Sequence, residues 1–240
     1  MPNNYFQFKQ FTIQQDKCAM KVCTDACVFG AWFARKDLNA KSILDIGSGT
    51  GLLMLMLAQN HSSNFQGIEI DSICFQQLKE NISNSQWSER IELVEGDVRN
   101  FSSERKFDFI ISNPPFYENS LTSPSAGFNL ARHSSHLTLE ELLTAVNLNL
   151  SQSGSLGLLL PYHRSKEFET IAKANDFQVV EKVSVRQSPR HNYFRSIYHC
   201  SRTQQEDISE KEIVIQTESS EYTEEFIELL KDYYLYLRPD

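Results

Sequence analysis

Residues 42–51 read SILDIGSGTG, a short apolar run that leads into Gly47, Gly49 and Gly51. An apolar run with helical character follows, so the segment predicts a strand, a glycine loop and a helix in succession. Glycines permit positive φ and let a ligand lie against bare backbone at the start of the helix. The spacing is G-x-G-x-G, whereas a nicotinamide dinucleotide fingerprint is G-x-G-x-x-G and has no role for Asp45.

A second motif follows another strand candidate. The apolar run 107–112 leads directly into Asn113-Pro114-Pro115-Phe116. The Asn113 side-chain oxygen and the Pro114 carbonyl would accept from the N–H bonds of an exocyclic amine and prime it as a nucleophile. The prolines have fixed φ and no N–H, which holds that carbonyl outward, and Phe116 is free to stack on a planar substrate. The alternative is an ordinary Asn-Pro turn that closes a strand.

Two further strand candidates end in acidic residues. The run 65–70 contains Glu69 at the place where doubly wound folds hold a ribose, and Asp71 is the competing choice or the cap of the following helix. The run 90–95 leads into Asp97, which could accept from an adenine amino group. A Gly-Asp pair after a strand is also a common turn.

The motifs D-x-G-x-G-T-G, G-I-E-I-D, E-G-D-V and N-P-P-F occur in this order within residues 41–116. Together they resemble the class I S-adenosylmethionine-dependent methyltransferases, in the branch that methylates amines. The resemblance implies a Rossmann-like α/β fold, with a seven-stranded, mostly parallel sheet flanked by helices, and S-adenosylmethionine as cofactor. It implies that the methionine part is held by Asp45, Gly47, Gly49 and Gly51, the ribose by Glu69, the adenine by Asp97, and the target amine by Asn113, Pro114, Pro115 and Phe116.

The flanking segments are similar to one family of these enzymes. Residues 6–33 read FQFKQFTIQQDKCAMKVCTDACVFGAWF, and F-x-x-x-Q-F-x-I followed by M-K-V-x-T-D and G-A-W resembles the N-terminus of the tRNA1(Val) adenine N6-methyltransferase family. Arg132 and His133, the run 158–161 and a strand ending in Arg195 fit the same family. The resemblance implies methylation of adenine 37, next to the anticodon.

A short amphipathic helix is predicted over 25–33, with Thr24 as a plausible N-cap. Because it precedes the first strand, it would close the methionine end of the cofactor pocket and place Thr24 and Asp25 near the cofactor. Thr24 could instead only cap the helix. Cys23 and Ala26 stand where the family resemblance implies glycines, which bears on the φ values of this loop more than on its role.

Length and composition indicate one methyltransferase domain. With 240 residues, 40% hydrophobic and 22% charged, the chain can bury a full core. We expect an N-terminal segment (1–40) that closes the cofactor site, a catalytic core (41–202) and an acidic C-terminal part (203–240) with an edge strand near 212–217 and a helix over 222–237. No apolar run approaches 18 residues, so we expect no signal peptide, no membrane span and a cytoplasmic enzyme.

The five cysteines form no C-x-x-C pair, and their odd number suits reduced thiols better than a disulfide framework. Cys23 and Cys27 are spaced to pack on one helix face, and we expect no metal site.

The net charge of −8 opposes RNA binding, but its distribution does not. Residues 203–240 hold 3 basic and 11 acidic residues, and the rest of the chain balances to zero. The stretch 186–202 holds four arginines and no carboxylate, Arg186, Arg190, Arg195 and Arg202. It could face a phosphate backbone, or it could form two antiparallel strands with a solvated hairpin.

Residues 117–137 show no sustained helical or strand periodicity of apolar residues. A loop of this length directly after N-P-P-F is predicted to be a substrate lid. Arg132 and His133 would return from it toward phosphate or base, although a lone histidine near a site is more often structural.

The expected activity is N6-methylation of an adenine in tRNA. The adenine must leave its stack, which is cheaper in an anticodon loop than in a duplex, so tRNA is the expected partner. One alternative is a protein glutamine N5-methyltransferase, which uses the same N-P-P-F chemistry but usually carries an N-terminal helical domain. The other is a non-catalytic RNA-binding module on the same fold, against which the intact Gly47, Glu69, Asp97 and Asn113 argue.

Overall fold

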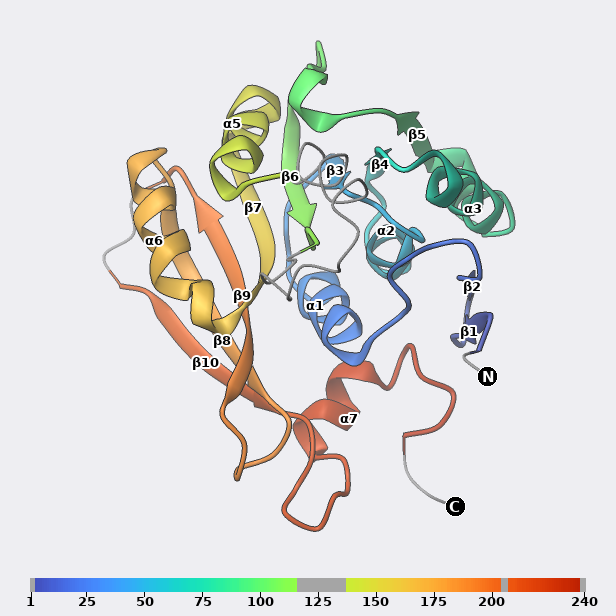
Figure 1. Ribbon diagram of the computed structural model, residues 1–240, viewed down its shortest axis with the longest axis vertical. Helices are drawn as coiled ribbons and strands as arrows, with labels where there is room; N and C mark the ends of the chain where they lie inside the picture. The colour runs from blue at the N-terminus through green and yellow to red at the C-terminus, as the bar shows by residue number, and fades with distance from the viewer. Residues whose placement is uncertain (1–2, 116–136, 204–206, 238–240) are drawn as a thin grey trace, which may run out of the picture.

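The fold is built on one eight-stranded sheet in the order β10-β8-β9-β7-β6-β3-β4-β5 (Figure 1). The structure is a computed structural model that describes residues 3–115, 137–203 and 207–237. Its strands are β3 (Ser42–Ile46), β4 (Asn64–Glu69), β5 (Ile91–Glu95), β6 (Phe107–Ser112), β7 (Leu150–Pro161), β8 (Gln178–Arg186), β9 (Tyr193–Ser201) and β10 (Ser209–Val214). All neighbouring strands are parallel except where β9 is involved. The predicted α/β fold with a mostly parallel sheet is confirmed, but the sheet has eight strands rather than seven because β10 pairs with β8.

Helices bury both faces of this sheet. In β3, Ile43 belongs to one hydrophobic cluster, whereas its neighbours Leu44 and Ile46 belong to the other, as the alternation of a strand requires. The first cluster contains side chains of α1 (Thr24–Ala34), α2 (Leu52–Ala58), α3 (Ser72–Ser83) and α7 (Glu224–Leu230), and the second those of α5 (Leu139–Asn149) and α6 (Ser165–Ala174). Strands buried on both faces read as continuous apolar runs, which is why they are visible in the sequence.

The C-terminal helix is shorter than predicted. It ends at Leu230, whereas the apolar spacing predicted a helix as far as residue 237. The chain turns there, so that the Tyr233 hydroxyl donates to the carbonyl of Met56 at 3.0 Å, and Tyr234 forms a β-bridge with Phe8. Tyr233 is fully buried by the turn, so the predicted apolar set docks on the core without one continuous helix.

The N-terminal segment is docked on α3. After a small hairpin of β1 (Tyr5–Gln7) and β2 (Thr12–Gln14), the chain runs along this helix. The buried Gln77 side-chain oxygen accepts from the backbone N–H of Lys17 at 2.8 Å, and Asn81 accepts from that of Gln14 at 2.9 Å. Buried amides that satisfy backbone groups fix the path of a segment that has no regular structure of its own.

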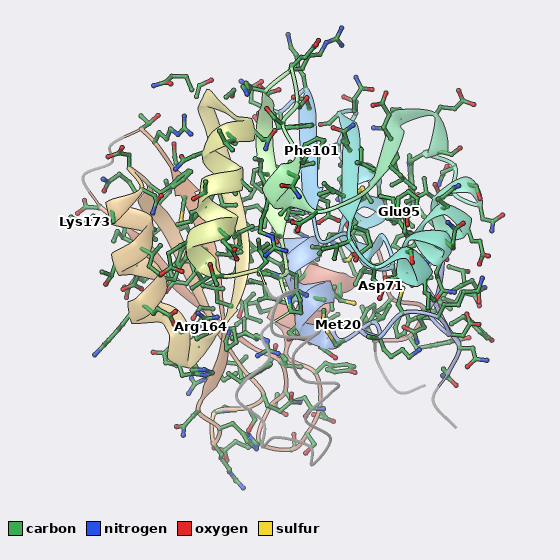
Figure 2. All side chains as sticks on the ribbon, turned by 45° about the horizontal axis from the view of Figure 1, so that its top comes forward. Met20, Asp71, Glu95, Phe101, Arg164 and Lys173 are labelled. Atoms are coloured by element: carbon green, nitrogen blue, oxygen red, sulfur yellow. A yellow bond between two sulfur atoms is a disulfide. The ribbon has the colours of Figure 1, made fainter. Side chains whose placement is uncertain are left out.

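A disulfide joins the same two elements. Cys18 and Cys74 are bonded, with Cα atoms 4.7 Å apart, so the prediction that all five cysteines are reduced thiols is wrong. The two residues are 56 positions apart, and only the docking of the N-terminal segment on α3 brings them together. Figure 2 shows Met20 and Asp71, which lie close to the bonded cysteines in sequence, near each other. Cys23, Cys27 and Cys200 remain free thiols.

Reduction of this disulfide is expected to lower the free energy of unfolding by about 2–4 kcal/mol, because it releases a long loop in the unfolded chain. Urea unfolding with and without a thiol reductant measures the difference. A Cys18→Ser, Cys74→Ser double variant is the control and should show no response to the reductant. Titration of five free thiols in the unreduced native protein would contradict the prediction.

Candidate active site

The glycine loop after β3 is shaped for close approach of a ligand. Gly47, Gly49 and Gly51 have φ of 72°, 55° and 85°, which is the left-handed region that glycine adopts without strain. A Cβ at Gly47 would meet nothing within 4 Å, and at Gly49 only the Gly47 carbonyl at 4.0 Å. At Gly51 a Cβ would lie 2.8 Å from Leu78. The first two glycines therefore leave open backbone, whereas the third allows α3 to pack against the loop.

Asp45 is a buried carboxylate at the base of this loop. It is 0% exposed, and neither of its oxygens accepts a hydrogen bond from any residue that the structure describes. Burial, with a smaller effect of the nearby Glu69, raises the pKa of Asp45 to about 8. A buried carboxylate without a partner is costly, so this position is suited to a cationic or hydrogen-donating ligand.

Glu69, at the end of β4, connects two loops. One carboxylate oxygen accepts from the backbone N–H of Gly49 at 2.8 Å, and the other from that of Asp71 at 2.9 Å. Each oxygen has a further lone pair for a ligand. Asp71 is the N-cap of α3, where it accepts from the backbone N–H of Cys74 at 2.8 Å. The geometry therefore favours Glu69 over Asp71 as a ligand-binding group.

Asp97 follows β5 and lies in an ion pair that the sequence did not indicate. It accepts from the backbone N–H of Arg99 at 2.9 Å, and its two oxygens receive the guanidinium of the same residue. The side-chain hydrogen bonds of Arg99 hold the pKa of Asp97 below its usual value. Arg99 also reaches Glu141 on α5 at 3.4 Å. Arg99 was missed because a pair two residues apart in a turn has no periodic signal.

The Asn-Pro-Pro segment lies at the same edge of the sheet as the glycine loop. Ile46, the last residue of β3, pairs with Ser112, the last residue of β6, so Asn113 is level with Gly47. Asn113 is partly buried and Pro114 is buried. Pro115 is exposed, and Phe116, Arg132 and His133 lie outside the described residues, as does most of the predicted lid. Amide, carbonyl and open backbone are thereby brought to one carboxyl edge.

The start of α1 faces the end of β7 and the start of β9. Cys23, not Thr24, is the N-cap, without a side-chain hydrogen bond, and Thr24 is the exposed first residue of the helix. Asp25 is buried, and its Oδ2 accepts from Nε of Arg195 at 2.6 Å. The structure thus joins Asp25 and Arg195, for which the sequence predicted separate roles.

Two other arginines of the basic stretch also form ion pairs with carboxylates, whereas Arg202 donates to Asn147. Arg186 contacts Glu212 at 2.9 Å, and Arg190 contacts Glu218 at 2.7 Å, so the acidic C-terminal part neutralises both. The backbone forms the two antiparallel strands of the alternative interpretation, β8 and β9. A contact with phosphates stays a prediction.

The described part of the chain contains no group of three or more His, Cys, Asp or Glu side chains placed to hold a metal ion. None of its helices is long and apolar enough to span a membrane.

Known proteins are similar to this chain in sequence and in fold. The methyltransferase small domain family matches residues 27–181. The chain is 40% identical over 240 residues to the tRNA1(Val) (adenine(37)-N6)-methyltransferase of Dyadobacter fermentans, which covers 98% of this chain and 99% of that protein. It is 39% identical over 234 residues to the protein of the same name from Haemophilus influenzae, which covers 96% and 98%.

Solved structures agree on the fold. A protein from Agrobacterium tumefaciens described as a predicted O-methyltransferase superposes with a TM-score of 0.68 at 16% identity, over 90% of this chain and 100% of that one. A putative RNA methyltransferase from Pyrococcus horikoshii has a TM-score of 0.53 at 21% identity, over 76% and 84%. At these identities the likeness concerns the fold alone.

Proposed function

Because the chain belongs to the methyltransferase small domain family, among the tRNA1(Val) (adenine(37)-N6)-methyltransferases, we propose that it methylates N6 of adenine 37 in tRNA1(Val) with S-adenosylmethionine. The observation that carries the proposal is the juxtaposition of Asn113 and Pro114 with an open glycine loop at one edge of the sheet. Binding alone would not require an amine-priming amide at that place.

The residues at the glycine loop fit this cofactor. Asp45 offers an unpaired buried carboxylate for the methionine ammonium, and Gly47 and Gly49 leave backbone that a side chain would block. Glu69 would accept from the ribose hydroxyls, and Asp97 from the adenine amino group. The cofactor, when bound, supplies a methyl group on a sulfonium, so the protein's task is to align the amine and to stabilise developing charge.

Replacement of Glu69 by alanine is expected to weaken S-adenosylmethionine binding by about 1.5–3 kcal/mol, as for lost hydrogen bonds to a charged group. Asp71→Ala should change this affinity far less, because the Asp71 side chain caps α3. Calorimetric titration measures both affinities. Glu69→Gln keeps one acceptor oxygen, so its affinity for S-adenosylmethionine should lie between those of Glu69→Ala and Asp71→Ala. A larger loss for Asp71→Ala than for Glu69→Ala would assign the ribose to Asp71.

The target amine would be primed by the chain itself. The Asn113 side-chain oxygen and the Pro114 carbonyl would accept its two N–H bonds, and the prolines keep that carbonyl fixed. The planar base would stack on Phe116. An adenine in an anticodon loop reaches such a site at a lower unstacking cost than one in a duplex.

RNA contacts outside the base would come from Arg132, His133 and Arg190. Arg190 forms an ion pair with Glu218, and the two side chains are 70% and 60% exposed. An exposed pair of this kind contributes little, so a phosphate could replace the carboxylate. We also propose a cytoplasmic location, on the basis of the tRNA substrate.

Incubation with isotopically labelled cofactor tests the function. Three substrates are compared, unmodified tRNA1(Val), the same tRNA with guanine at position 37, and a peptide release factor. Label in N6-methyladenosine from the first alone is the expected result. Label in release-factor glutamine would indicate a protein N5-methyltransferase, and tRNA binding without any transfer would indicate a binding module.

A further inference from the structure

A partly buried ion pair joins α1 to β9 beside the candidate active site. Nε of Arg195 donates to Oδ2 of Asp25 at 2.6 Å, and their side chains are 35% and 11% exposed. The carboxylate lies in the first turn of α1, where the helix dipole favours negative charge. The pair is therefore held from both sides, by a helix terminus and by a strand.

The sheet register places this pair on one particular side of Asn113. Arg195 pairs with Pro161, the last residue of β7, and β7 pairs with β6 through Leu158 and Ser112. The strand order is β9-β7-β6-β3. At about 4.8 Å between neighbouring strands, β9 is about 10 Å from the strand of Asn113 and about 14 Å from that of the glycine loop. The cofactor loop and the ion pair thus lie on opposite sides of the amine site.

The described residues accept hydrogen bonds from only two of the three nitrogens of the Arg195 guanidinium. Nε is taken by Asp25, and Nη1 donates to the carbonyl of Phe194 at 3.4 Å. Within residues 3–115, 137–203 and 207–237, Nη2 makes no hydrogen bond. A guanidinium oriented by a carboxylate on one edge presents the other as a fixed fork, which suits phosphate. Arg186 and Arg190 differ, because exposed carboxylates of the C-terminal part face them.

We propose that Arg195 binds a backbone phosphate flanking the target adenine, and that Asp25 is a positioning residue that orients its guanidinium rather than contacting the cofactor. This inference rests on the proposed function. A base held at Asn113, with the cofactor on the β3 side, leaves its sugar and phosphates toward β7 and β9. Arg164, in the turn that follows β7 (Figure 2), belongs to the same edge.

A thermodynamic cycle between protein and RNA tests the contact. The RNA is the anticodon stem-loop of tRNA1(Val), in which each phosphate flanking adenine 37 is replaced in turn by a neutral methylphosphonate. For one position, we expect kcat/KM of the unaltered protein to fall by about 10- to 100-fold. Arg195→Ala should lower it similarly with natural RNA, with little further loss on the altered RNA. Arg195→Lys keeps the charge but not the forked donor geometry, so its kcat/KM should lie between that of the unaltered protein and that of Arg195→Ala.

The role of Asp25 is tested separately. Asp25→Asn should lower kcat/KM for the RNA by about 10-fold and leave the calorimetric affinity for S-adenosylmethionine unchanged. Arg35→Ala is the matched control, because Arg35 lies at the other end of α1, 3.8 Å from Glu228, and it should match the unaltered protein.

Independent, multiplying losses from Arg195→Ala and from the altered RNA at both positions would overturn the phosphate contact, even if a variant were less stable. Weaker cofactor binding by Asp25→Asn would overturn the orienting role. Failure of the proposed function is distinct, since the unaltered protein would then methylate neither natural tRNA nor the stem-loop, and the phosphate assignment would fall with it.

Discussion

Replacement of Asn113 by alanine is expected to slow methyl transfer by about 100-fold or more, while the affinity for S-adenosylmethionine stays nearly unchanged. The amide oxygen is the side-chain acceptor for the target amine, and loss of one preorganised partner of a transition state typically costs this much. The cofactor affinity is spared because the groups proposed to hold it lie at the carboxyl ends of β3, β4 and β5 and in the loops that follow them. Single-turnover methylation of the anticodon stem-loop, together with calorimetric titration of the cofactor, measures both quantities.

A matched asparagine provides the control for this variant. Asn147 accepts from Arg202 at 2.8 Å near the start of β7, at the end of the sheet opposite to Asn113. Asn147→Ala should therefore methylate the RNA at the rate of the unaltered protein. Thermal melting of both variants separates a loss of chemistry from a loss of folding. Turnover of Asn113→Ala at the rate of the unaltered protein would refute the amine-priming role.

The architecture was predictable because its signals are local. Asp45, Glu69 and Asn113 each end or follow an apolar run, and such runs are strands of a sheet buried on both faces. Since β3, β4 and β6 are parallel neighbours, residues that follow them meet at one edge without any information on long-range contacts. Periodicity and turn residues therefore sufficed for the order of the elements and for the place of the site.

The pairing of side chains that are far apart in the sequence was not predictable. Asp25 and Arg195 are 170 positions apart, and their ion pair depends on how α1 packs against the sheet. The Cys18–Cys74 disulfide likewise depends on the docking of a segment without regular structure. The edge strand β10 was predicted near residues 212–217 but spans Ser209–Val214, because the acidic run that contains it has only one fully buried residue, Ile213, and therefore a weak apolar signal.

Replacement of Asp45 by asparagine is expected to have two opposite effects. It should weaken S-adenosylmethionine binding by about 3–5 kcal/mol, as for removal of one partner of a buried charge pair. It should also stabilise the protein without cofactor near pH 8 and above, because an amide replaces a buried carboxylate that no described residue satisfies. A site that is costly to the free protein and favourable in the complex is typical of ligand-binding groups.

The pH dependence of stability tests the second effect. Burial raises the pKa of Asp45 from 3.8 to about 8. Between these two values the folded protein holds a proton that the unfolded chain has released. The free energy of unfolding should therefore fall as pH rises through this window, by up to about 1.4 kcal/mol per pH unit from this group, and the fall should end above pH 8. Asp45→Asn should lack this contribution, which urea unfolding at pH 6 and pH 8 measures as a difference between the two proteins.

The same titration predicts a proton released by cofactor binding. A carboxylate paired with the methionine ammonium must be ionised, so below pH 8 the unliganded protein loses a proton when it binds S-adenosylmethionine, and affinity should rise with pH up to that value. Calorimetry in two buffers of different ionisation enthalpy counts the proton, and Asp45→Asn should release none. If the variant bound the cofactor normally, or released the same proton, the ammonium would have to be held by another carboxylate, and Glu69, whose oxygens already receive two backbone N–H groups, would be the next to test.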